Sequence, residues 1–303
     1  MKKRNIVILL IIILIIGVLY FYFNKNKDPY SFKGTRMYYS EDRGEIDYSM
    51  ELREENVSYD IYNISFLSKP FRNEETKIYG LLFLPHIAGV DYDISGVIIV
   101  PGGGVTKEQR IDISRVIAES GYSVLVIDQR GIGETGGSYL NLDQDFEIFM
   151  NGGEPIQHLS VYDVLRSYDV LKEIEGVGDE ITLLGESMGG RYSLISAAVD
   201  KRINGVIAVS SSGFEMSYDP NNPTSVYMMS IDPDNYIHRI SPNPVYFIHT
   251  NNDSVISLDS SKNTFDKARE PKEFLMVEDK MCLHGFCEKM YKPIIEVLGE
   301  IFE

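Results

Sequence analysis

The chain has 303 residues, which is enough for one large domain or two small ones. Apolar residues make up 44% of the sequence, an ordinary share for a globular protein that buries a sizeable core. The formal net charge is −16, and so acidic a protein is a poor nucleic-acid binder because phosphate groups repel it.

The amino terminus has the pattern of a membrane anchor. Residues 2–4 are Lys-Lys-Arg, and residues 6–23 are apolar or aromatic without a single charge. This run is near the length that crosses a hydrocarbon core of ~30 Å as a helix. No small-x-small cleavage site follows it. We therefore expect an uncleaved signal anchor over residues 1–24, a transmembrane helix, rather than a removed signal peptide.

The flanking charges indicate how such an anchor is oriented. The positive residues 2–4 favour a cytoplasmic amino terminus, which predicts a single-pass protein of the cell membrane with an extracytoplasmic body. Lys25 and Lys27 on the other flank weaken this prediction. Residues 25–56 are rich in charged residues, Tyr and Ser with little periodicity. We interpret them as a tether that becomes the edge of a folded domain over residues 57–303.

From Ser58 onward, strand and helix patterns alternate. Two early strands are expected, and after them buried strands alternate with helices, which is typical of a parallel sheet covered on both faces. The strands are predicted over Ser58–Phe66, Lys77–Phe83, Gly96–Val100, Tyr122–Asp128, Ile181–Leu184, Ile203–Ser210, Pro244–His249 and Glu273–Val277. The helices are predicted over Lys107–Ser120, Leu159–Glu175 (amphipathic), Arg191–Val199, Ser260–Ala268 and Cys287–Phe302.

Two connections between these elements are long. A polar loop is predicted after QRGIGETGG, up to about Gln157. The stretch Gly213–Ile240 is irregular, with several Pro, Asn, Met and Tyr residues. It is short for a cap domain, so we expect a fairly open site.

The segment ITLLGESMGGR contains a candidate nucleophile. The apolar run Ile181–Leu184 leads into Gly-Glu-Ser-Met-Gly and then into a helical pattern, which is the arrangement of a nucleophile elbow. In such a turn Ser187 takes a strained backbone conformation, while Gly185 and Gly189 lack Cβ atoms and let neighbouring chain pass close by. The alternative is an ordinary tight turn between a strand and a helix.

A serine nucleophile needs a base and an orienting carboxylate, which in this type of sheet follow later strands in the order Ser, acid, His. His284 follows the last predicted strand, and Asp253 follows the strand PVYFIH, so we predict these two residues as the base and the acid. The competing acids are Asp232, Asp234 and Asp259, the last of which is better explained as a helix cap. The other histidines are interpreted as surface, packing or loop-shaping residues: His86, His158, His238 and His249.

Acyl attack creates an oxyanion that needs two aligned donors. We predict the backbone N–H of Met188, directly after the nucleophile, as one of them. The other is predicted from the loop Pro101–Gly104, with Gly103 as first choice and Gly104 as second. A phosphate-binding loop is the alternative, but no Gly-Lys-Ser/Thr follows and Gly-x-Gly-x-x-Gly is not matched.

Two cysteines, Cys282 and Cys287, lie on either side of His284. A disulfide between them is permitted if the body is extracytoplasmic, and we hypothesise that it limits the movement of His284. Two thiols alone do not complete a zinc site, so no metal is expected.

These motifs resemble those of the α/β-hydrolase superfamily from about Ser58 to the end. The matching segments are IIVPGGG, VIDQRGIGETGG, LLGESMGG, PVYFIHTNNDSVIS and LHG. The acid segment is similar to that of dienelactone-hydrolase-like and prolyl-oligopeptidase-like members, and VIDQRGIGETGG resembles a loop of many esterases and serine aminopeptidases. The resemblance implies an α/β fold with a mostly parallel, eight-stranded sheet, helices on both faces and a short cap.

The resemblance and the residues together predict a membrane-anchored serine hydrolase that cleaves carboxylic esters through an acyl-enzyme, without a cofactor. Three alternatives remain open: a serine peptidase or aminopeptidase acting on short peptides, an acyl transferase or thioesterase, and a non-catalytic hydrolase-like binding protein. The motifs are specific to the superfamily and not to one reaction within it.

Overall fold

The structure, a computed structural model, describes residues 12–15, 28–90 and 93–303. Ile12–Ile15 are helical and exposed. Among the described residues, no helix has both the length and the apolar character needed to cross a membrane. The predicted anchor over residues 1–24 falls largely outside the described residues.

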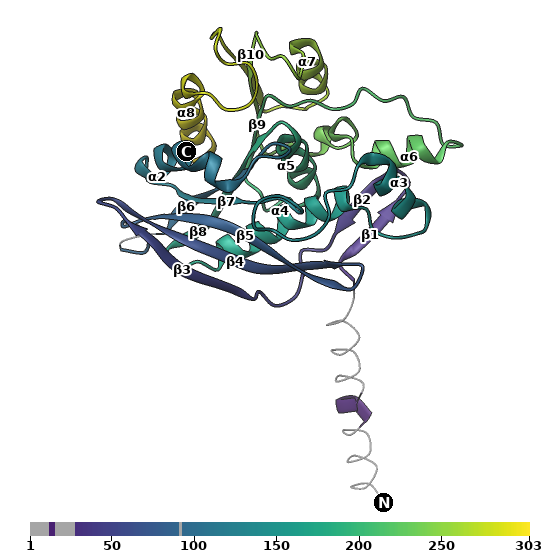
Figure 1. Ribbon diagram of the computed structural model, residues 1–303, viewed down its shortest axis with the longest axis horizontal. Helices are drawn as coiled ribbons and strands as arrows, with labels where there is room; N and C mark the ends of the chain where they lie inside the picture. Colours follow the sequence, from purple (N-terminus) through teal and green to yellow (C-terminus); the bar gives the residue numbers. More distant parts are fainter. Residues whose placement is uncertain (1–11, 16–27, 91–92) are drawn as a thin grey trace, which may run out of the picture.

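A nine-stranded sheet runs through the centre of the molecule in the order β11-β10-β9-β8-β6-β7-β5-β4-β3 (Figure 1). The strands from β6 to β11 pair in parallel, whereas β3, β4 and β5 form an antiparallel extension that joins the sheet at β7. The expectation of eight strands is wrong by one, because β3 was not predicted. The strands are β3 (Tyr48–Glu55), β4 (Tyr59–Phe71), β5 (Glu74–Pro85), β6 (Ile94–Val100), β7 (Ser123–Ile127), β8 (Val177–Glu186), β9 (Val206–Val209), β10 (Val245–Thr250) and β11 (Lys272–Val277).

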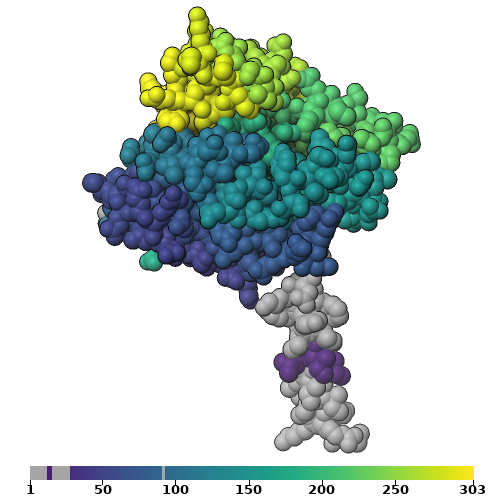
Figure 2. All heavy atoms as spheres, viewed as in Figure 1, coloured from purple at the N-terminus to yellow at the C-terminus, as the bar shows by residue number. Residues whose placement is uncertain are grey.

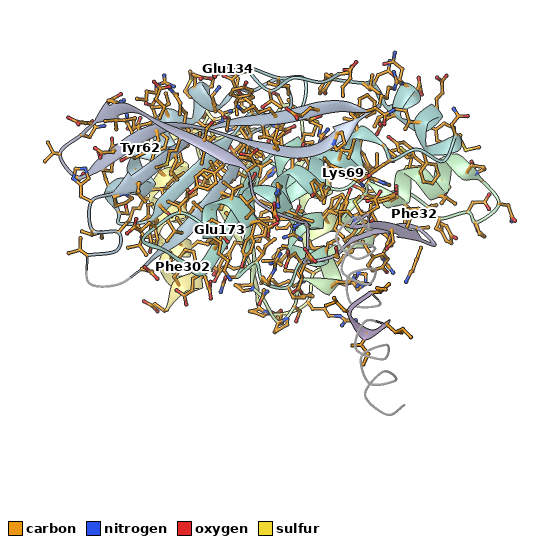
Figure 3. All side chains as sticks on the ribbon, turned by 90° about the horizontal axis from the view of Figure 1, so that it is seen from below. Phe32, Tyr62, Lys69, Glu134, Glu173 and Phe302 are labelled. Carbon is orange, nitrogen blue, oxygen red and sulfur yellow. A yellow bond between two sulfur atoms is a disulfide. The ribbon has the colours of Figure 1, made fainter. Side chains whose placement is uncertain are left out.

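Helices cover both faces of this sheet, as the sequence predicts. Side chains alternate along a strand, so on β6 Ile98 and Val100 join the core under α4 and α5, while Val97 and Ile99 join the core under α2 and α8. Figure 3 shows Tyr62 on β4 and Phe302 on α8 toward one end of the molecule and Phe32 toward the other. The covering helices are α2 (Ile111–Glu119), α4 (Ile156–Lys172), α5 (Met188–Val199) and α8 (Tyr291–Phe302).

Residues 25–56 are interpreted from the sequence as a tether that becomes the edge of the domain, and their described part, residues 28–56, contributes three strands to the folded body. The hairpin of β1 (Tyr30–Lys33) and β2 (Arg36–Tyr39) packs beside the sheet, and β3 forms its edge. Met37 is fully buried, and Arg43 forms buried ion pairs with Asp169 at 2.6 Å and Asp200 at 2.9 Å. The described part of this segment therefore belongs to the domain.

The two long connections also contain helices that the sequence analysis does not predict. The polar loop includes α3 (Leu142–Met150), which begins with a capping box between Asn141 and Gln144. The irregular stretch includes α6 (Pro223–Ser230) and two short 3₁₀ turns. Figure 1 shows α3 and α6 at the end of the molecule where the β1–β2 hairpin lies. The remaining elements are α7 (Leu258–Asp266) and 3₁₀ turns at Lys107–Arg110 and Glu288–Met290.

Candidate active site

Ser187 occupies the turn between β8 and α5, with φ 51° and ψ −115°. Such a conformation is rare for a residue with a side chain and stores backbone strain. The tight turn also explains the flanking glycines. A Cβ at Gly185 would lie 2.6 Å from the carbonyl oxygen of Gly189, and a Cβ at Gly189 would overlap the carbonyl oxygen of Val100. The Gly-x-Ser-x-Gly spacing is therefore a packing requirement of this turn.

The structure brings Ser187, His284 and Asp253 together from the loops after β8, β11 and β10. His284 Nε2 lies 2.9 Å from Ser187 Oγ, and His284 Nδ1 lies 2.9 and 3.0 Å from the two carboxylate oxygens of Asp253. The side chain of Asp253 is 1% exposed, whereas that of His284 is 25% exposed. A buried carboxylate thus orients an imidazole that remains accessible, and the imidazole can accept a proton from the hydroxyl.

The carboxylate of Asp253 is held in its charged form. Burial alone would raise its pKa, but the hydrogen bond with His284 and the backbone N–H groups of Ile256 and Val255 outweigh burial and lower the pKa of Asp253 below its usual value. These two N–H groups donate to Asp253 Oδ1 at 2.8 and 2.9 Å. Asp253 can therefore stabilise a positive imidazolium at His284 without itself taking up a proton.

Among the described residues, neither the competing acids nor the other histidines form a hydrogen bond or ion pair with Ser187, although His249 lies beside Asp253. Asp232 accepts the N–H groups of Phe214 and Asp234, and Asp234 forms an ion pair with Lys267. Asp259 lies in the first turn of α7, whose cap is Ser257. His249 Nε2 donates to the Ile256 carbonyl oxygen at 3.1 Å and lies 3.9 Å from Asp253 Oδ2, so it lies beside the acid and not beside Ser187. His86 pairs with Asp60 at an exposed site, His238 lies in a 3₁₀ turn, and His158 is completely buried.

The loop Pro101–Gly104 faces the start of α5, where the N–H of Met188 has no preceding helical carbonyl to bind. Val105 N–H donates to the Gly102 oxygen at 3.2 Å, and Gly104 has φ 76°, which forms a tight turn that suits glycine. A Cβ at Gly103 would lie 3.5 Å from Met188 Cε, whereas one at Gly104 would meet no described atom within 4 Å. Of the two predicted glycines, Gly103 is the one beside Met188.

Sequence reasoning missed Glu186, the residue before the nucleophile. Its buried carboxylate accepts two hydrogen bonds from Arg110, at 2.7 and 2.8 Å. It also accepts the N–H groups of Gly102 and Phe286, each at 3.3 Å. Glu186 therefore joins the Pro101–Gly104 loop to the loop that carries His284. The Glu of Gly-Glu-Ser was visible in the sequence, but nothing there indicates partners so distant along the chain.

The loop of His284 is closed by a disulfide between Cys282 and Cys287. It is also bound to the acid loop, because Ser254 N–H donates to the Leu283 oxygen at 2.7 Å and Asn252 Nδ2 donates to the Asp279 oxygen at 3.0 Å. Figure 2 shows these carboxyl-terminal segments, in yellow, on the opposite side of the molecule from the blue amino-terminal strands. Across residues 28–90 and 93–303, no group of three or more His, Cys, Asp or Glu side chains is placed to hold a metal.

Comparisons with known proteins agree with this architecture. Residues 97–230 match the family described as alpha/beta hydrolase fold. A protein of Escherichia coli O157:H7 named uncharacterized protein YfhR is 25% identical over 215 residues, which cover 68% of this chain and 70% of that protein.

Solved structures with the same architecture include two acetyl xylan esterases. The enzyme of Paenibacillus sp. R4 is 18% identical with a TM-score of 0.69, covering 86% of this chain and 90% of its own. Acetyl xylan esterase 1 of Thermoanaerobacterium sp. JW/SL YS485 is 17% identical with a TM-score of 0.67, covering 86% of this chain and 89% of its own. Together with the sheet order and the turn at Ser187, these likenesses identify the chain as a protein of the α/β-hydrolase fold.

Proposed function

We propose that this protein is a serine hydrolase that cleaves carboxylic esters. The observation that carries the proposal is the continuous chain of short contacts from Ser187 through His284 to Asp253, each at 2.9 Å. The likeness in fold to esterases is consistent with it. Because the imidazole of His284 is accessible from solvent, an ester of modest size can reach it.

In the proposed reaction, Ser187 Oγ attacks the acyl carbon while His284 Nε2 takes its proton, and Asp253 stabilises the resulting imidazolium. The backbone N–H groups of Met188 and Gly103 hold the oxyanion. His284 then gives the proton to the departing alkoxide oxygen, and an acyl-enzyme on Ser187 remains. Water, deprotonated by His284, cleaves this acyl-enzyme and restores the serine.

The test is the variant Ser187→Ala with p-nitrophenyl esters as substrates. Because the three side chains act as a unit, kcat should fall by roughly 10⁴-fold or more. The matched control is Ser120→Ala at the carboxyl end of α2, where the hydroxyl only donates to a helix carbonyl at 2.8 Å. A fluorophosphonate probe should label the wild type and not the Ser187 variant. Full turnover in Ser187→Ala would contradict the proposal.

The same experiment separates the rival functions. Faster turnover of aminoacyl p-nitroanilides than of esters would favour a peptidase, since both use the same triad. Transfer of the acyl group to an added thiol or alcohol in preference to water would favour an acyl transferase. Absence of labelling by the fluorophosphonate would favour a non-catalytic binding protein.

We also propose that residues 1–24 anchor the protein in the cell membrane with residues 57–303 extracytoplasmic. The support is the uncharged run at residues 6–23 behind three basic residues. The full chain should remain with membranes after carbonate extraction and be digested by protease added to intact cells. Recovery in the soluble fraction would contradict the anchor.

A further inference from the structure

Among the half-buried or buried arginines of the described residues, Arg191 and Arg239 have no acceptor for the guanidinium, and of these two Arg191 is the one beside the candidate nucleophile. It lies on α5, one helical turn after Ser187. Among the described residues, no side chain or carbonyl accepts a hydrogen bond from its guanidinium, and no carboxylate lies within ion-pair distance. Its one described side-chain contact is with the ring of Phe214, whose centroid is 4.5 Å from the guanidinium carbon. The other arginines with little exposure have carboxylate or carbonyl acceptors: Arg43, Arg110, Arg130 and Arg166.

Helix geometry directs this side chain toward the candidate nucleophile. Residues four apart lie on one face of a helix, and side chains lean toward its amino terminus, so Arg191 leans toward Ser187. The backbone confirms the spacing, because Arg191 N–H donates to the Ser187 oxygen at 3.2 Å. Arg191 also interacts electrostatically with Tyr139, whose hydroxyl lies 3.9 Å from Met188 Sδ. The helix spacing therefore places Arg191 one turn after Ser187 on the same face of α5.

The surroundings of the guanidinium leave its charge poorly compensated. Burial lowers the pKa of Arg191, and the opposing influence of Tyr192, Asp232 and Tyr139 does not restore it. Asp232 accepts the N–H groups of Phe214 and Asp234 through Oδ1, while its buried Oδ2 has no hydrogen-bond partner and forms no ion pair with Arg191 among the described residues. A cation that has lost water without gaining an acceptor is costly, and a ligand anion would remove that cost.

We propose that Arg191, stacked on Phe214, binds a carboxylate on the substrate. The inference rests on the proposed ester hydrolysis and names the class of ester, one that carries a free carboxylate on its acyl or its alcohol portion. A guanidinium supplies one positive charge and a planar pair of N–H donors, which match a carboxylate monoanion in both charge and shape. The net charge of −16 repels anions at long range, so an anionic substrate needs such a local cation.

The experiment compares matched substrates that differ in one charge. On the alcohol side the pair is para-acetoxybenzoate and para-acetoxybenzamide, and on the acyl side it is mono-p-nitrophenyl adipate and its methyl ester. The readout is the ratio of kcat/KM between the anionic and the neutral member. For one pair the wild-type ratio should exceed one, and Arg191→Gln should lower that ratio by about tenfold to a hundredfold. Arg191→Lys should retain part of the preference because it keeps the charge.

The control is Arg239→Gln, which also removes an arginine from an aromatic ring, that of Tyr38 at 5.5 Å. It should leave the ratio unchanged. Wild-type ratios at or below one in both pairs, with neutral esters cleaved by Ser187-dependent turnover, would overturn this inference and leave the proposed function standing. Loss of all Ser187-dependent turnover would overturn both.

Thermal unfolding tests whether the role of Arg191 is purely structural. If the role of Arg191 were to balance the charge of Asp232 rather than to bind substrate, Arg191→Gln would lower Tm, and adding Asp232→Asn in a double variant would restore it. The Arg191→Gln variant would then also cleave both members of each substrate pair more slowly by the same factor. That result would overturn the inference. An unchanged or raised Tm with a lowered ratio supports it.

Discussion

The carboxylate of Glu186 lies where three segments of the candidate site meet. It binds Arg110 at the end of a 3₁₀ turn, the N–H of Gly102 beside the predicted oxyanion donor, and the N–H of Phe286 two residues after His284. Glu186 touches none of the reacting atoms in these contacts. We propose it as a positioning residue, which sets the distance between the loop predicted to hold the oxyanion and the loop that carries His284.

Glu186→Gln tests this role. The amide keeps the size of the side chain but loses the charge that binds Arg110 through two hydrogen bonds. We expect kcat on a p-nitrophenyl ester to fall by about tenfold, with KM less affected, because a shift of the two loops acts on the transition state. Breaking this largely buried pair should also cost on the order of 3 kcal/mol in the free energy of unfolding.

The double variant Glu186→Gln with Arg110→Gln distinguishes positioning from stability. Removing both charges should recover part of the unfolding free energy but not the lost kcat. Unchanged kcat in a destabilised Glu186→Gln protein would reduce Glu186 to a purely structural residue.

Among single residues, the sequence predicts those site residues that lie in a local motif or directly after a recognisable strand. Ser187 stands in Gly-x-Ser-x-Gly, and Asp253 and His284 each follow a recognisable strand, so their meeting could be predicted. Glu186 and Arg110 carry no such mark, because their pairing spans 76 residues and depends on how two loops fold over the sheet. Arg191 visibly follows Ser187 by four residues, but no sequence pattern shows that its guanidinium has no described acceptor.

Among the elements, helix α4 differs most from its prediction. The sequence predicts an amphipathic helix over Leu159–Glu175 with its polar face in water, whereas α4 is buried from Ile156 to Leu171 on all sides, apart from the half-buried Gln157. Some of its polar side chains are bound by the amino-terminal segment, and Asp163 is bound by Arg130. Arg166 donates to the Gly44 oxygen at 3.1 Å, and Tyr30 Oη lies 3.0 Å from His158 Nδ1. The pattern of α4 is helical, but it does not reveal which polar residues are covered.

His158 on this helix predicts a dependence of stability on pH. Burial lowers its pKa from 6.5 to about 3. Because the folded pKa is depressed, the unfolded chain takes up the proton first as the pH falls. Stability from a neutral His158 is therefore present above about pH 6.5 and is lost between that pH and about pH 3, at up to about 1.4 kcal/mol per pH unit.

Denaturant unfolding of the wild type and of His158→Gln over this pH range measures the effect. The variant removes the titrating ring, so its unfolding free energy should fall less steeply with acid than that of the wild type. His86→Gln, at an exposed pair with Asp60, is the matched control. Equal slopes for the wild type and His158→Gln would show that the imidazole does not titrate on unfolding.

For the whole molecule, the alternation of strands and helices was enough to predict a parallel sheet covered on both faces, since each buried strand is a short apolar run. The amino-terminal strands could not be found in this way. Strand β3 lies at the sheet edge with most of its side chains exposed, so it has no apolar period. The hairpin is held by single buried contacts such as Met37 rather than by a repeating pattern.

The domain boundary therefore makes a prediction about truncation. A fragment that begins at residue 29 keeps β1, β2 and β3 and should unfold in one cooperative transition. A fragment that begins at residue 57 loses the buried Met37 and the cation of Arg43, which leaves Asp200 with Arg202, and Asp169 with Arg202 and Arg166, as ion-pair partners among the described residues. Uncovering these carboxylates and the polar face of α4 should lower Tm by more than about 10 °C or prevent folding.

Circular dichroism melts and size-exclusion chromatography of the two fragments check this prediction. Equal Tm values would mean that residues 29–56 are an appendage and not part of the domain.

The bridge between Cys282 and Cys287 bears on how the protein should be produced. Disulfides form in oxidising compartments and are rare where glutathione keeps thiols reduced. Protein made in a reducing bacterial cytosol would carry two thiols in place of the closed loop around His284. Poor turnover by such a batch would reflect the host and not the chemistry of Ser187, so material secreted to a periplasm is the proper starting point for an assay.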